Sequence, residues 1–473
     1  MIRVELPAEG LTPAEQYGLD TLLDLSGLLR VEDRSAAVVA LHLTPDPTPM
    51  AQLLKGIAGG AVTDGTVRLP RELLTHVTAI AGAAVEQGTD RADRQGRVPA
   101  DANPLVEWGV ERVPIVSQWA RSLRILVQQA AGMRPVRYLV PWPGGKRWAA
   151  AFTHDVDVVT GWPVFTSLRL LELLRSGQVS RAGRVAMAAA GSVLRAPAWD
   201  GVRGVLSAEE AHGVRSTWFF LCGRRTFDTW RRGDVTYAIR SRAARRIVAA
   251  VVSAGHELAV HGSFATSTRD GAFADERATL LSVSGGTRAA GGVRQHFLKM
   301  RPGATQTRMQ KAGFIYDATY GFSDRNGFRL GVADVVQGWD AHANTATALD
   351  EVPLHWMDRA QSKYQGIENP DAWIDDAMDL AERCRALGGL WVGLWHPNLT
   401  EPLGFPDAPA AYAELLQRIV DDPNPPAVDT LGKLLDWRRR RRSARARRVG
   451  PNGGVEWVDL PAPLEDQEGK AIA

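Results

Sequence analysis

The stretch from Trp148 to Asp157, WAAAFTHDVD, decides the fold of this 473-residue chain. Its first six residues, which end at Thr153, have the length and the largely apolar composition of a buried β-strand. Two carboxylates, Asp155 and Asp157, follow directly. Residues i and i+2 of an extended segment point to the same side. Both carboxylates are therefore expected to face the same side at the end of this strand.

Strand-like segments alternate with helix-like segments beyond this point. A parallel sheet is typical of such alternation, and a series this long favours closure into an α/β barrel over an open sheet. No glycine-rich phosphate loop follows the first strand, which argues against a dinucleotide-binding fold. The expected strands are 148–153, 216–221, 257–261, 292–297, 314–319, 332–336, 349–354 and 390–395.

The length of the chain predicts more than one domain, because single domains usually stop growing near about 250 to 300 residues. The barrel is expected over residues 147–437, after a smaller α+β domain of unknown role in residues 1–140. Apolar residues recur at helical spacing over 114–132, so a helix is expected to lead into the barrel. Pro141 and Pro143 then mark the boundary.

Ionisable residues gather at the carboxyl ends of the expected strands. Asp155 and Asp157 follow the first strand, and His261 ends the third. In β/α barrels the loops at this end surround a common mouth, where the chemistry takes place. One cleft is therefore expected to collect these three side chains and four others, which are Arg294, His296, Asp317 and His396.

The histidines of these strands are not equivalent. His256 and His261 are separated by an odd number of residues, so only one of them can face the mouth, and His261 is favoured because it ends its strand. A histidine at position 396 has a pKa range suited to protonating a leaving amine. Trp395 and Tyr320 offer flat apolar faces on which a ligand ring could stack, although core packing explains them equally well.

The order of these motifs resembles the polysaccharide deacetylases of carbohydrate esterase family four, the NodB-homology domain. The resemblance covers residues 147–437 and is carried by T-H-D-V-D at 153–157, the strand 216–221, G-H-E at 255–257 with His261, Arg294, G-F-I-Y-D at 313–317 and L-W-H at 394–396. It is closest to a bacterial branch whose first motif reads H-D-V-D.

This resemblance implies a distorted (β/α)7-type barrel that removes N-acetyl groups from an amino sugar or glycan precursor. It implies a divalent metal, commonly zinc, bound by Asp157 and His261. By the same resemblance Asp155 is the general base, Arg294 orients that base, and His396 is the general acid.

The sequence departs from the family at one position. The family has a second histidine four residues after the first, and Ala265 stands there. Catalytic zinc usually has three protein ligands, whereas Asp157 and His261 supply two. Three alternatives follow: His154 or His296 completes the shell, the metal binds weakly and at low occupancy, or the protein works without a metal.

Ala265 also favours a rival function, a carbohydrate-binding or scaffold protein that has kept the barrel and lost turnover. The presence of Asp155, Arg294 and His396 together favours the enzyme. A binding module needs neither a base with an orienting cation nor an acid.

Composition limits the partners. The chain has two cysteines, which occur in no disulfide or zinc-thiolate spacing, and no window long and apolar enough for a secretory signal or a membrane span, so a cytoplasmic protein is expected. The net charge of +3 gives no reason to expect nucleic-acid binding. A basic run (Arg438–Arg442, Arg445, Arg447 and Arg448) opens residues 438–473, where we expect a solvated helix end and a flexible tail, or weak contact with an anionic surface.

Overall fold

The structure is a computed structural model of the chain. It describes residues 2–5, 10–28, 39–63, 65–134, 136, 138–160, 162–192, 196–286, 291–443, 446–449 and 455–457.

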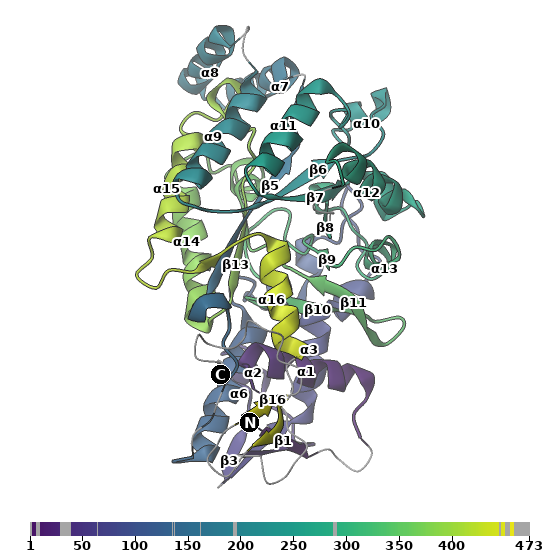
Figure 1. Ribbon diagram of the computed structural model, residues 1–473, viewed down its shortest axis with the longest axis vertical. Helices are drawn as coiled ribbons and strands as arrows, with labels where there is room; N and C mark the ends of the chain where they lie inside the picture. Colours follow the sequence, from purple (N-terminus) through teal and green to yellow (C-terminus); the bar gives the residue numbers. More distant parts are fainter. Residues whose placement is uncertain are drawn as a thin grey trace.

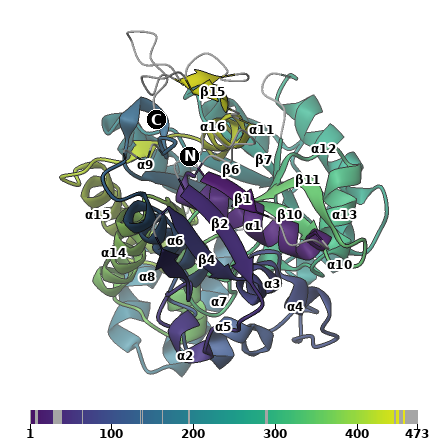
Figure 2. The same ribbon diagram turned by 90° about the horizontal axis from the view of Figure 1, so that it is seen from below.

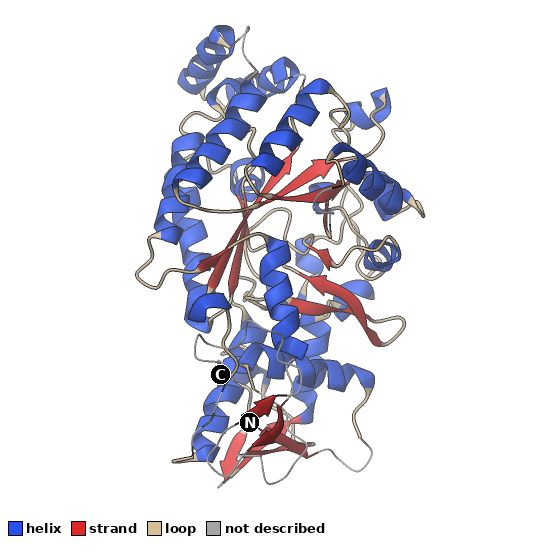
Figure 3. Ribbon diagram, viewed as in Figure 1, coloured by secondary structure: helices blue, strands red, loops and turns tan. Residues whose placement is uncertain are grey.

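The larger part of the molecule is built on one curled, mostly parallel sheet (Figure 3). Strand β5 (Ala149–Val156) lies inside this sheet, and all eight of its residues are buried. Burial on both faces explains why its sequence is a continuous apolar run rather than an alternating one. On one side the order is β6 (Thr217–Leu221), β7 (Glu257–Gly262), β8 (Gly292–Gln295), β9 (Tyr316–Asp317), β11 (Thr345–Glu351) and β10 (Val336–Asp340); on the other it is β13 (Leu390–Leu394) and β12 (Trp356–Met357).

The prediction of an α/β barrel fold is confirmed, with two differences in detail. The path has nine strands instead of about seven, and a further short strand, β14 (Ala427–Val428), pairs with β5. Most of the expected strand 332–336 is irregular, and the observed strand β10 begins only at Val336. Strands β10 and β11 then form an antiparallel hairpin. The hairpin turn holds Asn344 at φ 51°, a conformation that asparagine tolerates better than most residues.

Helices cover the outside of the sheet, as Figure 1 shows. They follow the strands in the chain, which is the arrangement that parallel pairing requires. The main ones are α9 (Pro197–Ala211), α11 (Arg242–Ser253), α12 (Ala272–Val283), α13 (Ala304–Lys311), α14 (Pro370–Leu387) and α15 (Ala408–Val420). Helices α7 (Trp162–Arg175) and α8 (Val179–Gly191) lie at one end of the molecule (Figure 1).

The N-terminal part has its own four-stranded sheet, which lies at the other end of the molecule (Figure 2). Its order is β1 (Ile2–Glu5), β2 (Val39–Thr44), β4 (Thr66–Pro70) and β3 (Ala61–Thr63). Helices α1 (Pro13–Ser26), α3 (Arg71–Ala81) and α6 (Ile115–Ala131) pack with it, and their buried side chains form one cluster with Leu330 and Val332 of the barrel. The two parts therefore share a hydrophobic core.

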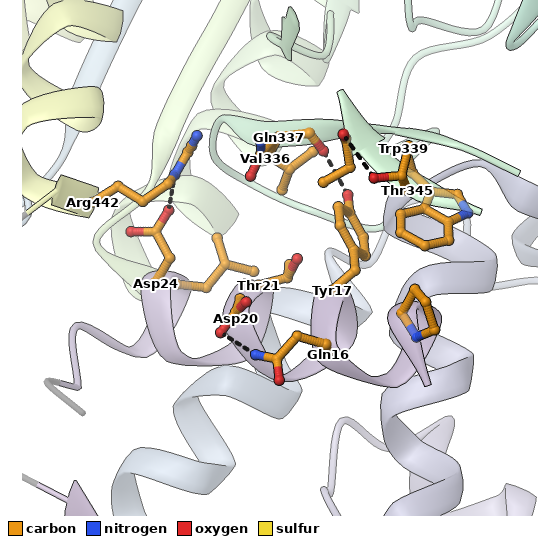
Figure 4. A pocket seen from close by; sticks show the side chains of 13 residues that line it. Gln16, Tyr17, Asp20, Thr21, Asp24, Val336, Gln337, Trp339, Thr345 and Arg442 are labelled. Carbon is orange, nitrogen blue, oxygen red and sulfur yellow. Dashed lines mark hydrogen bonds and ion pairs between the residues drawn. The ribbon is translucent and has the colours of Figure 1, made fainter. Parts of the chain in front are cut away.

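Within the basic run Arg438–Arg442, the expectation of solvated side chains is wrong for Arg438 and Arg441. These residues belong to α16 (Leu431–Ser443), and Arg438 and Arg441 are buried. Asp24 at the end of α1 accepts hydrogen bonds from Arg441 and Arg442, and Figure 4 shows the contact with Arg442. The acidic partners on the facing elements, which the sequence order does not reveal, explain the burial.

The rest of that expectation is not tested by the structure. Arg445 lies outside the described residues, as do residues 450–454 and 458–473. For Arg447 and Arg448 only the backbone is described, in strand β15 (Ala446–Val449), which pairs with β16 (Val455–Trp457). No helix in the described ranges is long and apolar enough to cross a membrane.

Asp24 provides a test of the contact between α1 and α16. Burial alone would raise the pKa of Asp24, but Arg438, Arg442 and Arg441 lower it to about 2. Replacing Asp24 by Asn removes the carboxylate that these arginines share and takes from the buried Arg441 its ion-pair partner, so the free energy of unfolding at pH 7 should fall by about 3 kcal/mol. Urea unfolding of the two proteins measures the difference.

The sign of the pH effect follows from the lowered pKa. The carboxylate stabilises the fold above the unfolded-state pKa near 4, and this stabilisation is lost as the pH falls toward about 2. The gap between wild type and Asp24→Asn should therefore narrow between pH 4 and about 2. Asp20→Asn, an exposed position on the same helix, is the matched control and should cost little. Equal stability of the Asp24 and Asp20 variants would contradict the account.

Candidate active site

The carboxyl ends of the barrel strands bring five of the predicted site residues to one cavity of about 450 Å³. Asp155 comes from the end of β5, and Asp157 follows it directly. His261 lies near the end of β7, His296 follows β8, and His396 follows β13. Parallel pairing places these ends at the same edge of the sheet, which is why residues 241 positions apart in the chain meet there.

Arg294 lies behind this cavity and holds Asp155. Its Nη1 donates hydrogen bonds to Oδ1 of Asp155 at 2.9 Å and to the hydroxyl of Thr153 at 3.0 Å. Its Nε donates to the carbonyl of Ala318 at 3.0 Å. The guanidinium is fully buried, so it interacts with the carboxylate in a medium of low dielectric. One oxygen of Asp155 is thereby fixed, and the other faces the cavity side, 3.4 Å from Nε2 of His261.

Asp157, His261 and His296 form a group with the geometry of a metal site. One ligand atom from each lies within 4.8 Å of the other two. Oδ1 of Asp157 is buried and makes no hydrogen bond to any residue that the structure describes, although Nε2 of His261 lies 3.4 Å away and Nε2 of His296 lies 3.5 Å away. A buried carboxylate oxygen without a partner is costly unless a cation or water satisfies it. One carboxylate and two imidazoles form a ligand set that suits zinc.

Hydrogen bonds and backbone conformation set the direction of both imidazoles. Nδ1 of His261 donates to the carbonyl of Arg294 at 3.0 Å, which leaves Nε2 free for a metal. After His296 the chain turns through Phe297 and Leu298, which have φ values of 59° and 53°. Non-glycine residues in this region cost about 1 to 3 kcal/mol each and cluster at functional sites. This turn directly follows the histidine that faces Asp157.

His396 is held from behind by Asp358. The backbone N–H of His396 donates to Oδ2 of Asp358, and Nδ1 donates to Oδ1, both at 2.6 Å. Nε2 therefore points to the other side, where it lies 3.6 Å from Oδ2 of Asp157. Burial by itself would lower the pKa of His396, but the carboxylates of Asp358, Asp157 and Asp155 raise it above the usual value.

The same charges act on the two aspartates. Burial alone would raise the pKa of Asp155, but His261, Arg294 and His396 lower it. Burial would also raise the pKa of Asp157, yet the histidines around it, His296 first, hold it well below the usual value. Both carboxylates are therefore ionised at neutral pH, and an ionised carboxylate is the form that accepts a proton or binds a metal.

Two contributors were missed in the sequence. Asp358 follows β12, a strand of two residues that is too short to predict. Asp234 lies in the loop between α10 (Phe227–Arg231) and α11, and its Oδ1 is 3.9 Å from Nδ1 of His296. Neither residue has a neighbouring motif that distinguishes it from an ordinary loop carboxylate.

Three predicted site residues lie elsewhere, namely His154, Asp317 and Trp395. His154 points to the opposite side of β5, where its ring contacts Glu209 of α9 and the carbonyl of Trp395. Asp317 is buried against Thr319 and Gln306, outside the residues that line the cavity.

The aromatic candidates also belong to the core. Trp395 is buried and stacks on Trp356, and Tyr320 belongs to the core shared with the N-terminal part. The interpretation of these rings as core packing is therefore the one that fits. His256 is likewise structural, because its Nδ1 accepts a hydrogen bond from the backbone of Ser216.

Ala265 lies on a short 3-10 helix, Phe264–Ser267, after β7. It is exposed and does not line the cavity. His296 instead brings the third ligand atom to Asp157 and His261. Of the two candidates that the sequence left open for this place, the geometry therefore favours His296 over His154.

Comparisons with known proteins find similarity to solved structures. A protein from Mycobacterium smegmatis assigned to the polysaccharide deacetylases is 22% identical, with 66% of this chain and 97% of that chain covered and a TM-score of 0.44. One from Pseudomonas aeruginosa PAO1 with the same assignment is 15% identical, with 65% and 96% covered and a TM-score of 0.41. A pseudoenzyme of carbohydrate esterase family four from Bacillus anthracis is 10% identical, with 61% and 65% covered and a TM-score of 0.32.

No family model matches the chain, and no curated protein matches it. The solved structures carry the name of the family whose motif order the sequence resembles.

The three-residue group gives a direct prediction about metal. Purified protein should bind one zinc ion per chain, and Asp157→Ala, His261→Ala or His296→Ala should each weaken binding by about tenfold or more, because each removes a ligand atom. His154→Ala is the matched control and should bind zinc like wild type, since its ring faces away. Elemental analysis and zinc titration measure the change. Normal binding by His296→Ala together with loss in His154→Ala would reverse the assignment.

Proposed function

We propose that the protein is a divalent-metal-dependent hydrolase that removes N-acetyl groups from an amino sugar or glycan precursor. The observation that carries the proposal is a combination in one cavity: a carboxylate held by a buried arginine, a histidine held by a buried carboxylate, and a possible metal site between them. A site that only binds sugar has no need for this combination.

The residues divide the reaction between them. Asp155 is the base: it takes a proton from the water whose oxygen attacks the acetyl carbonyl carbon. Arg294 keeps Asp155 ionised and directs its free oxygen. His396 is the acid: it gives a proton to the sugar nitrogen as the carbon–nitrogen bond breaks, and acetate and a free amine leave.

Asp157, His261 and His296 would hold the metal. A bound divalent ion supplies Lewis acidity that polarises a carbonyl and its attacking water. These three residues otherwise keep the ligand atoms close together. Burial would lower the pKa of His296, but Asp157 and Asp234 raise it to about 9, so a cation would displace a proton from this ring on binding.

The cavity lining supports a sugar-sized substrate. Its volume of about 450 Å³ falls in the usual range for small-ligand sites. Phe297, Tyr364 and Phe405 offer aromatic surface, and Arg359 and Lys363 add positive charge at the same wall. We infer a substrate with an apolar ring face and an anionic group in addition to the acetamido group, as a phosphate-linked precursor has.

An acetate-release screen over N-acetylated sugars and their phosphate-linked forms tests the proposal, with zinc-loaded and chelated protein compared side by side. Zinc-dependent acetate release supports the enzyme. Sugar binding without any acetate release by the zinc-loaded protein would support instead the carbohydrate-binding protein that Ala265 favours.

Replacing the base should stop the reaction without removing the substrate. Asp155→Asn keeps the size of the side chain but removes its proton affinity, so kcat should fall by about two to four orders of magnitude with KM nearly unchanged. Steady-state kinetics and substrate binding measure the two effects. Activity within a few fold of wild type would exclude Asp155 as the base.

Asp358 should act through His396. Asp358→Asn removes the charge that holds Nδ1, so kcat should fall by about ten- to a hundredfold while zinc stoichiometry stays the same. The pH above which activity declines should also move down, since Asp358 is the first of the carboxylates that raise the pKa of His396. Asp324→Asn changes a less buried aspartate of the same part of the chain and is the control. A fall in kcat with no shift of the pH profile would mean that Asp358 is only structural.

A further inference from the structure

A second and larger cavity, of about 680 Å³, lies between the N-terminal part and the barrel. One wall comes from a single face of α6, on which Ser117, Arg121 and Arg124 recur at helical spacing. The opposite wall comes from Arg147 before β5 and from Gly389 before β13. The cavity therefore lies at the amino ends of the barrel strands.

This cavity is separate from the candidate active site. Arg147 precedes β5, whereas Asp155 is near its end, and eight residues of extended chain span about 26 Å. Among the residues that the structure describes, none lines both cavities.

The most buried charged side chains that line the second cavity are two arginines of α16. Arg438 is 1% exposed and Arg441 is 2% exposed. Nε and Nη2 of Arg438 and Nε of Arg441 are buried and make no hydrogen bond in the described part of the chain, although Nη2 of Arg438 lies 3.1 Å from Oδ2 of Asp334. Buried N–H groups without a partner are rare, so a bound acceptor is expected here.

Positive charge is in excess around these two arginines. Five further cations line the same cavity, against two acids, Asp334 and Glu382. Asp24 and Asp422 pair with lining arginines from just outside, which reduces the excess from five charges to three. The five cations are Arg121, Arg124, Lys146, Arg147 and Arg385.

The surroundings of Arg441 agree with an excess of positive charge in this cavity. Burial and the neighbouring Arg438 lower the pKa of Arg441 to about 9. Lys146 is half-buried and Arg147 is exposed, so they line the rim of the cavity, and neither has an ion pair or side-chain hydrogen bond within the described residues. An uncharged water molecule would satisfy the orphaned N–H groups but would leave this charge uncompensated.

We infer that this cavity is a binding site for a phosphate- or diphosphate-bearing small molecule. An excess of three positive charges exceeds what one carboxylate balances, whereas phosphate groups carry about two charges near neutral pH. Arginine forks match phosphate oxygens in pairs. No lining residue in the described chain is aromatic, so the geometry selects the phosphate group and offers no ring on which a nucleobase would stack.

Such a ligand would connect the two parts of the molecule. Leu25, Ser26 and the α6 arginines belong to the N-terminal part, whereas Arg147, Arg385 and Arg438 belong to the barrel and α16. A bound anion would lie between cations of both, so its binding should stabilise the assembled chain, by an amount that grows with the logarithm of its concentration above Kd. The inference shares no residue with the proposed hydrolase site, so either can fail without the other.

Calorimetric titration and thermal unfolding of the full-length protein test the site, with inorganic phosphate and pyrophosphate as probes and sodium chloride of matched ionic strength as the reference. Pyrophosphate should bind more tightly than phosphate and raise the melting temperature. Lys146→Ala combined with Arg147→Ala should weaken pyrophosphate binding by about tenfold, because two charged donors at the rim are removed. These positions are at the surface of a loop, so the variant should fold.

The matched control is Arg203→Ala combined with Arg231→Ala, which removes two equally charged side chains, each 66% exposed, from α9 and α10. This variant should bind pyrophosphate like wild type. Arg438→Lys keeps the buried charge but loses the fork, and it should also weaken binding. Stabilisation no greater than that by chloride would overturn the inference, as would equal binding by the Lys146/Arg147 variant and its control.

Discussion

The buried pair between Arg294 and Asp155 is the interaction on which the candidate site depends. It joins β8 to β5 across the inside of the curled sheet, at a depth where neither charge would be stable without the other. Its position follows from the register, in which Arg294 lies beside His261 on the neighbouring strand. The same arginine therefore holds Asp155 directly and, through its own carbonyl, sets the direction of His261.

Much of the candidate site could be predicted from the sequence, because side chains along a β-strand alternate between its two faces. Asp155 and Asp157 share a side, and His154 between them must take the other, where it meets Glu209. The aromatic candidate Trp395 failed for the same reason, since it precedes His396 by one residue and enters the core. Asp358 could not be predicted, because its strand is two residues long and local patterning in the sequence is too weak to locate it.

The sequence predicted the environment of charged side chains least well where their ion-pair partners lie far away along the chain. The arginines of α16 read as a solvated run, yet Asp24, more than 400 positions earlier, makes a buried network with them. The composition of a run of like charges does not reveal which surface of the folded protein packs against it. The N-terminal part supplies that surface, which gives it a structural connection to the barrel even though its sequence holds no chemical motif.

The turn at Phe297 and Leu298 has a consequence for how such proteins are recognised. On the proposed assignment, the third ligand has moved from the helix after β7 to the loop after β8, 31 positions along the chain from Ala265, while the cluster stays compact in space. A sequence motif that requires a fixed number of residues between two histidines does not detect a site in which the second histidine comes from another loop. Detecting such sites would require comparing the three-dimensional positions of the ligand atoms. Spacing along the chain can change whenever a neighbouring loop places a ligand atom at the same position in space.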